Sequence, residues 1–191
     1  MANDVYKQFP AMENQRVLLR EVDGERDAEA LLKVYSDEKA VPLFNSDNCN
    51  GDDFHYTTLG RMEKAIEFWQ FSYSHGYFVR WAVVDKQSGE TVGTIELFNR
   101  QAEDYFDNCG LLRLDLRSDH ETEDFIGNVL QVVVPRVGEM FGCEMVATKA
   151  IAAAGKRIRV LEEFGFRLSE ERLTGHDGTK YGSYYVRECD Q

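Results

Sequence analysis

Short runs of β-branched and aromatic residues alternate along this chain with stretches whose apolar residues recur at helical spacing. Such alternation predicts a mixed α/β domain in which helices cover a central sheet. The expected strands are residues 17–22, 78–84, 91–98, 110–116, 145–151, 166–173 and 183–187. The expected helices are residues 28–35, 60–73, 125–141 and 155–164. Residues 1–14 have no clear periodicity, so we expect a loosely held N-terminal arm over residues 1–15 and one domain over residues 16–191.

Two turns and one proline refine this order. The polar, glycine-containing segment 85–89 joins two expected strands into an antiparallel hairpin. Gly165 follows the last expected helix at the position that favours a left-handed cap. Apolar residues recur at every fourth position of 125–141, but Pro135 lies among them, and a proline inside a helix costs about 3 kcal/mol unless the helix kinks. Continuity of this helix therefore stays open.

The composition predicts a packed, cytoplasmic protein. Hydrophobic residues make up 43% of the chain and only three residues are proline, which disfavours disorder. The four cysteines are scattered without a C-x-x-C pair, so we expect reduced thiols rather than a disulfide framework or a zinc site. The N-terminus has no cationic segment followed by an apolar run, and no stretch approaches the roughly 20 apolar residues of a membrane span. Secretion and membrane insertion are both disfavoured.

The formal net charge of −12 limits the classes of partner. A field of this sign repels nucleic acid and attracts cations, so a cationic amine or a basic peptide is the expected type of ligand. Solubility alone explains most of these carboxylates equally well. We expect no nucleic acid or membrane partner and a monomer or homodimer.

Three stretches, in their order along the chain, resemble one enzyme family. RVLLREVDGERDAEALLKVYSD at 16–37 resembles the opening of the branch that includes ribosomal-protein N-terminal acetyltransferases. VVDKQSGETVGTIELF at 83–98 resembles its central hairpin, and IRVLEEFGF at 158–166 resembles the helix that ends in glycine and phenylalanine. Together with the order of elements over 16–187, they resemble the GNAT superfamily of N-acetyltransferases. The resemblance implies the GNAT fold, a mixed and mostly antiparallel central sheet flanked by about four helices.

The resemblance also implies a reaction. It implies acetyl-CoA as co-substrate, no metal, and direct attack by a primary amine of a small molecule or a protein N-terminus. The pantetheine arm would bond to the backbone of strand 110–116, and the pyrophosphate would sit on the following loop and helix N-terminus. The implied cofactor-binding residues are Leu114, Asp115, Leu116, Phe125, Ile126, Gly127, Asn128, Lys156 and Arg157.

The phosphate loop departs from the family pattern of Arg or Gln, two variable residues, Gly, one variable residue, and Gly or Ala. The matching segment begins at Asp124 and ends at Val129, and only Gly127 agrees. Like charges about 4 Å apart repel by roughly 1 kcal/mol in water and about 4 kcal/mol at a dielectric of 20. A helix N-terminus returns only about 0.3–1 kcal/mol to an anion. Carboxylates facing the pyrophosphate would therefore abolish binding, whereas carboxylates pointing outward, with Ser118 or Thr122 beginning the helix, would stabilise it.

A second departure lies on the last helix. Ala154 stands where the family has the asparagine that meets the cofactor arm. Lys156, Arg157 and Arg159 could compensate with positive charge, or could form a solvated helix face. A calcium site in the acidic loop lacks the EF-hand spacing and is set aside.

Candidate catalytic groups are few. Glu96 projects from the hairpin strand that borders the acceptor cleft in the resembling family and could take the amine proton, although an outward surface glutamate is the commoner case. Asp115 and His120 are weaker candidates for this base. Tyr184, or Tyr185 beside it, could donate a proton to the thiolate, although tyrosines on a strand also serve packing.

The leading hypothesis is an N-acetyltransferase. The alternative is a catalytically degenerate GNAT-like binding or assembly module with weak or no acetyl-CoA binding, and a third is transfer from a different acyl-CoA, since Phe125 and Val129 are bulky. The segments expected to line the acceptor pocket, 41–58 and 99–108, carry no motif that identifies the acceptor.

Overall fold

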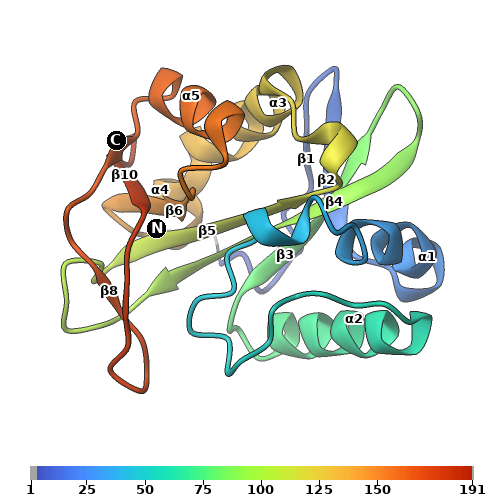
Figure 1. The fold of residues 1–191 in the computed structure, drawn as a ribbon, viewed down its shortest axis with the longest axis horizontal. Helices are drawn as coiled ribbons and strands as arrows, with labels where there is room; N and C mark the ends of the chain where they lie inside the picture. The colour runs from blue at the N-terminus through green and yellow to red at the C-terminus, as the bar shows by residue number, and fades with distance from the viewer. Residues whose placement is uncertain (1–3, 191) are drawn as a thin grey trace.

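A twisted sheet of eight strands forms the centre of the protein, and helices cover both of its faces (Figure 1). This computed structural model describes residues 4–190. The strand order is β1-β2-β3-β4-β5-β6-β10-β7, and all neighbours are antiparallel except β5 and β6. The strands of this sheet are β1 (Met12–Glu13), β2 (Val17–Glu21), β3 (Val79–Asp85), β4 (Glu90–Arg100), β5 (Cys109–Leu116), β6 (Met145–Lys149), β7 (Arg167–Leu168) and β10 (Tyr184–Glu188). The expected mixed, mostly antiparallel sheet is confirmed.

The helices divide between the two faces. α1 (Gly24–Tyr35) and α2 (Leu59–Ser74) pack together on one face, while α3 (Glu123–Val133) and α5 (Gly155–Glu163) pack together on the other (Figure 1). Side chains before three helices satisfy free backbone N–H groups, as helix N-caps do. Asp23 accepts from the N–H of Arg26, and Thr58 and Thr122 act in the same way for α2 and α3. Polar residues at these positions therefore fix where each helix begins.

Pro135 interrupts the long apolar stripe. α3 ends at Val133, a 3-10 turn follows as η3 (Val134–Arg136), and α4 (Val137–Phe141) continues the chain. A proline has no N–H to donate and its ring clashes with the preceding turn, so the backbone tightens there. The alternative of one continuous helix over 125–141 is thus excluded, although its apolar face is buried as expected.

The N-terminal segment is packed rather than loosely held over its described part. Val5 and Met12 are buried, and β1 pairs with β2. The indole Nε1 of Trp81 donates to the carbonyl oxygen of Pro10 at 2.7 Å. The sequence did not reveal this packing, because the apolar residues of the segment are too few and too irregular to show helical or strand periodicity. They nevertheless cover the core side of β3.

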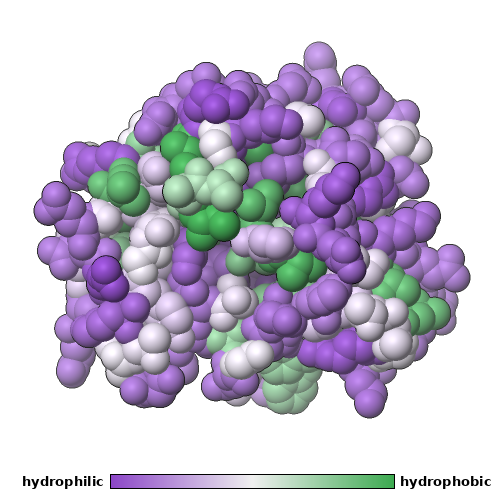
Figure 2. Space-filling view, in the orientation of Figure 1, coloured by the Kyte–Doolittle hydropathy of each residue, from purple (hydrophilic) through white to green (hydrophobic). Residues whose placement is uncertain are grey.

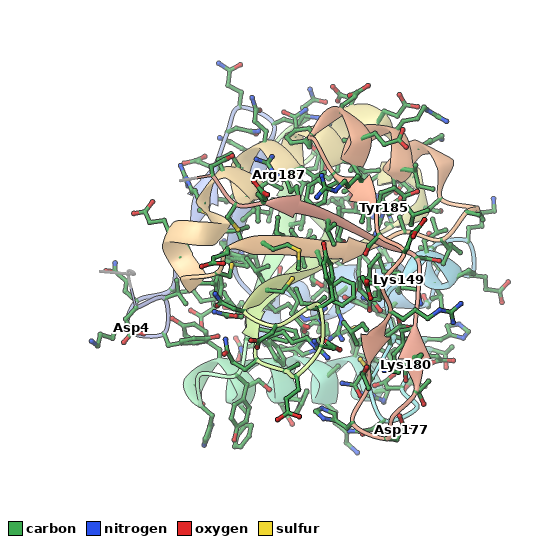
Figure 3. All side chains as sticks on the ribbon, turned by 90° about the vertical axis from the view of Figure 1, so that its left-hand side faces the viewer. Asp4, Lys149, Asp177, Lys180, Tyr185 and Arg187 are labelled. Atoms are coloured by element: carbon green, nitrogen blue, oxygen red, sulfur yellow. The ribbon has the colours of Figure 1, made fainter. Side chains whose placement is uncertain are left out.

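The expected strand over 166–173 is also wrong in its second half. Only β7 joins the main sheet, and β8 (Leu173–Thr174) instead pairs with β9 (Lys180–Tyr181) in a separate two-stranded sheet. Ser169, Glu170 and Glu171 between them give the backbone no apolar face to bury. The resulting hairpin lies beside the main sheet, with Asp177 near its tip and Lys180 on β9 (Figure 3).

The surface is mostly hydrophilic, in keeping with the charge of −12. Figure 2 shows polar residues over most of one face, with hydrophobic residues exposed in small, separate patches. Within residues 4–190, no helix is long and apolar enough to cross a bilayer. Over the same range, no three His, Cys, Asp or Glu side chains gather closely enough to hold a metal ion.

The closest backbone approach in the sheet gives a first prediction. A Cβ added at Gly93 on β4 would lie 2.0 Å from the carbonyl oxygen of Asp115 on β5. We expect Gly93→Ala to lower the free energy of unfolding by about 3 kcal/mol, because two central strands must separate to admit the methyl group. Gly60→Ala on α2, where a Cβ meets nothing within 4 Å, is the matched control and should be neutral or stabilising. Equal urea midpoints for the two variants would contradict this reasoning.

Candidate functional site

The pairing between the two parallel strands of the sheet ends partway along β5. β5 and β6 pair from Cys109 and Met145 as far as Leu112 and Thr148, and no further. β5 continues to Leu116 and stays paired with β4 on its other side. The backbone edge of β5 after Leu112 is therefore not paired by β6, and we call the space beside this unpaired edge the opening.

A cavity of about 1000 Å³ lies at this opening. Leu111 and Arg113 of β5 and Tyr184 of β10 line its inner wall, on the sheet face covered by α1 and α2. Its outer walls come from α2, from the β8–β9 hairpin, and from the two loops expected to line an acceptor pocket. Seven aromatic side chains besides Tyr184 contribute to the lining, namely Phe54, Tyr56, Phe68, Trp69, Tyr77, Phe78 and Phe98. The cavity is large enough for a small molecule or the end of a peptide.

Glu96 lies on the cavity wall between two arginines. Arg80 Nη2 donates to Glu96 Oε2, and Arg113 Nη1 donates to Glu96 Oε1 at 2.8 Å. Burial opposes ionisation of Glu96, but the charges of Arg80 and Arg113 outweigh it and hold the pKa of this carboxyl below its usual value. Both carboxylate oxygens are thus engaged, and the group stays charged at neutral pH.

Arg80 is the most deeply buried cation of the cavity wall. It is 4% exposed, its guanidinium lies 4.4 Å from the ring centre of Trp69, and it also donates to Thr94 and Asp115. Burial disfavours its charge, but Glu96 and the other acidic neighbours outweigh burial and raise the pKa of Arg80. The guanidinium therefore acts as a fixed positive charge beneath the aromatic lining.

Tyr184 is a fully buried residue of the cavity wall. Its hydroxyl donates to Asp47 Oδ2 at 3.0 Å and accepts from the side-chain amide of Asn45 at 3.2 Å. Burial, reinforced by the negative charge of Asp47, raises the pKa of Tyr184 well above its ordinary value. Lys149 holds Asp47 in place with two contacts of 2.7 Å. Figure 3 shows Lys149 at the end of β6, between β10 and the β8–β9 hairpin.

The local charge of the cavity differs from that of the whole protein. Its lining includes three acidic residues, and its basic residues are Arg61, Lys64, Arg80, Arg100 and Arg113. Four of these five cations are paired with carboxylates: Arg80 and Arg113 with Glu96, Arg61 with Asp52, and Arg100 with Asp104. A ligand in the cavity therefore meets ion pairs and aromatic faces.

The implied cofactor residues lie apart from this cavity, at the α3 and α5 side of the opening. Leu114, Leu116, Phe125 and Ile126 are buried in the core, and Asp115 points to the other face, where it accepts from the hydroxyl of Tyr35. Asn128 accepts from the side chain of Asn14, Gly127 is half-buried, and Lys156 is exposed. Of the two basic residues expected at the phosphates, Arg157 is buried.

Arg157 is held by an acidic partner. It donates to both carboxylate oxygens of Glu121, at 2.8 and 2.7 Å, and to the backbone carbonyl of Leu114 at 2.6 Å. Arg157 is 3% and Glu121 9% exposed. The ion pair therefore lies within the opening, against the unpaired edge of β5.

The acidic loop divides into outward and inward carboxylates. Asp124 has a side chain 80% exposed, Glu123 pairs with Arg159, and Asp119 pairs with Arg117. Thr122 begins α3, so the expectation of outward carboxylates and a threonine cap holds for these three residues. It is wrong for Glu121, which is buried because a second helix supplies a cation for it.

Two weaker candidates lie elsewhere. His120 contacts Asp85 and Asp119 through its two ring nitrogens and packs against Phe125. Tyr185 points away from the cavity and packs in the core beneath α3 and α5. Neither side chain lines the cavity.

Four contributors were missed from the sequence: Arg80, Arg113, Asp47 and Glu121. The two arginines occupy strand positions whose neighbours are apolar, and a charge inside such a run signals a buried partner. Nothing local marked Asp47 or Glu121, because their partners lie more than 30 residues away along the chain.

Comparison with known proteins agrees with this architecture. The family model described as Acetyltransferase (GNAT) domain matches residues 16–167. An acetyltransferase of the GNAT family from Bacillus anthracis superposes with a TM-score of 0.68 at 12% identity, covering 94% of this chain and 98% of that one. RimL, a ribosomal L7/L12 α-N-protein acetyltransferase in complex with coenzyme A, gives 0.68 at 14% identity, covering 93% and 96%. The microcin C7 self-immunity acetyltransferase MccE, in complex with acetyl-CoA and AMP, gives 0.67 at 14%, covering 92% and 93%. No curated protein sequence gives a significant match.

The family model covers most of the chain, so the protein belongs to the GNAT acetyltransferase family. The resemblance read from the sequence is confirmed, and the structural neighbours confirm the expected GNAT fold.

The Arg80–Glu96–Arg113 cluster gives the second prediction. Glu96→Gln removes the charge that compensates two buried guanidinium groups while it keeps the shape of the side chain. We expect a loss of about 3 kcal/mol in the free energy of unfolding, since breaking a buried ion pair leaves an uncompensated charge. Glu90→Gln on the same strand is the control, because Glu90 is exposed and its contact with Arg117 is 3.4 Å long. Similar chemical denaturation curves for both variants would refute a compensating role for Glu96.

Proposed function

We propose that this protein is an N-acyltransferase that moves an acetyl group from acetyl-CoA to a primary amine of a small molecule or peptide bound in the cavity. The observation that carries the proposal is the opening between β5 and β6, which places an unpaired strand edge directly beside the cavity. The order of elements, the family membership and neighbours crystallised with coenzyme A or acetyl-CoA support it. We further propose a single domain from residue 16 onward, acting in the cytoplasm as a monomer or homodimer.

The unpaired strand edge fits the donor in its chemistry. Backbone groups of β5 beyond Leu112 face the opening, where an extended chain carrying amides can bond to them as a neighbouring strand would. In the reaction, the bound donor supplies a thioester: a bond from the amine nitrogen to the acetyl carbon forms and the carbon–sulfur bond breaks. The nitrogen releases one proton to water, and the thiolate gains one. The residues of the chain then have to position the amine and provide that proton.

Tyr184 is the proposed proton donor. Tyr184 is among the residues that line the cavity, and its raised pKa keeps the proton on the phenol throughout the neutral range. The contacts with Asp47 and Asn45 fix the direction of this hydroxyl. Tyr184 thus holds a proton at the junction between cavity and opening.

Glu96 has a different proposed role. Its oxygens accept from Arg80 and Arg113, and its pKa is lowered, so it is poorly suited to take a proton from an amine. We propose instead that Glu96 is a positioning residue that fixes both guanidinium groups. The aromatic walls favour an acceptor that carries an aromatic group besides its amine.

The third prediction tests the reaction and its acid together. Acetyl-CoA and a panel of primary amines, including amino acids, aromatic amines and short peptides, are incubated with the full chain, and thiol release and product mass are followed. We expect a product with at least one amine. Tyr184→Phe should lower kcat about 100-fold with little change in KM, the effect of losing a general acid.

Tyr185→Phe is the control for this measurement, because its hydroxyl lies on the opposite face of the same strand. Equal losses in both variants would exclude Tyr184 as the acid. No acetylated product from any amine, together with no heat on titration of acetyl-CoA, would refute the acyltransferase proposal.

One observation favours a second function. The carbonyl of Leu114, which belongs to the unpaired edge, already accepts from Arg157. A chain in which this contact is permanent would be a GNAT-like binding module whose ligand occupies only the aromatic cavity. Binding of cavity ligands without any binding of acetyl-CoA would establish that alternative.

A further inference from the structure

A buried ion pair occupies the strand edge that the proposed donor requires. Arg157 reaches this edge from the first turn of α5, and Glu121 reaches it from the segment before α3. The two elements flank the opening between β5 and β6 on the face opposite the cavity. One contact thus joins both sides of the opening.

The geometry of the guanidinium resembles that of a paired strand. Arg157 Nη1 donates to Leu114 O at 2.6 Å, the contact that an amide N–H of a bound extended chain would otherwise make. Its Nε and Nη2 donate to the two oxygens of Glu121 in a bidentate pair. The edge is therefore satisfied internally, and an incoming amide finds its acceptor taken.

The pair is stable where it stands. Both side chains are largely excluded from water, and each neutralises the other, so neither can turn outward alone without leaving a buried charge behind. The other ion pair between the same elements, Arg159 with Glu123, is exposed and lies outside the opening. Only the inner pair can obstruct a ligand.

We propose that the Arg157–Glu121 pair is a lock on the donor groove, which acetyl-CoA must displace before it can bond to β5. The proposal rests on the acyltransferase function proposed above. It joins one residue of the acidic loop and one of the last helix in a single device: Glu121 and Arg157 lower the affinity for the donor together. Removal of both side chains opens the groove.

The test is calorimetric titration of acetyl-CoA into the full chain and into the double variant Glu121→Ala, Arg157→Ala. The double variant leaves no unpaired buried charge and keeps the net charge, so its affinity reports the opening of the groove alone. We expect a dissociation constant at least tenfold lower than that of the wild type, equivalent to about 1.4 kcal/mol. Acetyl-CoA should also raise the melting temperature of the double variant more than that of the wild type.

A matched control removes another bidentate ion pair with a fully buried carboxylate, Arg20 with Asp27, which joins β2 to α1 far from the groove. Arg20→Ala, Asp27→Ala should leave the affinity for acetyl-CoA unchanged. If the alanine pair in the groove melts below the assay temperature, Glu121→Gln, Arg157→Gln replaces it, since the amides keep hydrogen-bonding groups in place, the charges are lost, and glutamine is shorter than arginine. The same direction of change is expected.

Four results separate the proposals. Tighter binding by the double variant than by a wild type that also binds acetyl-CoA supports the lock. Binding by the double variant alone overturns both the displaceable lock and the proposed function, because the pair then closes the groove permanently. Binding by the wild type that is equal to or stronger than that of the variant overturns the lock and leaves the acyltransferase function intact. Absence of binding to both folded proteins overturns the lock and the proposed function together.

Discussion

Parallel pairing between β5 and β6 stops after four residues on each strand, and the functional architecture depends on that early end. β5 keeps its partner β4 along its whole length, so it remains anchored where its second edge is unpaired. β6 turns away after Lys149, whose side chain then contacts Asp47 above the cavity. A cavity on one face and a groove on the other thus share a single strand, and a ligand in either one meets the backbone or side chains of β5.

Buried charged groups raise the free energy needed to deform β5. Arg113 and Asp115 project from β5 toward the cavity side, where Arg80 and Glu96 from the two preceding strands complete a network of alternating charge. Groups in such a network stabilise one another only in a narrow range of geometry, because a displaced partner leaves a charge without solvation. The network therefore favours a preformed cavity wall. Arg113 also donates to the backbone carbonyl of Asp47 at 3.0 Å, which links the network to the residue that holds the Tyr184 hydroxyl.

The periodicity of apolar residues in the sequence was sufficient to predict the sheet and its helices, but it did not predict the residues of the site. Alternation and β-branched runs identified β2 to β6 and β10, since each buries a face large enough to leave a pattern. The strand expected over 166–173 failed beyond Leu168, where polar residues leave the sheet. The site escaped prediction because its contacts join distant segments: Asp47 to Tyr184, and Glu121 to Arg157. A single sequence shows which residues are charged, and the fold decides which charges meet.

The acidic loop illustrates that distinction. Counting carboxylates near the start of α3 suggests a surface that repels phosphate, and counting basic residues on α5 suggests compensation. In the structure, these charges form ion pairs between the two elements. Glu123 pairs with Arg159 in solvent, and Glu121 pairs with Arg157 in the groove. An exposed pair is screened and costs little to rearrange, whereas a buried pair must be exchanged for interactions of equal strength. The affinity of this groove for an anionic donor thus depends less on the net charge of the loop than on the position of one guanidinium.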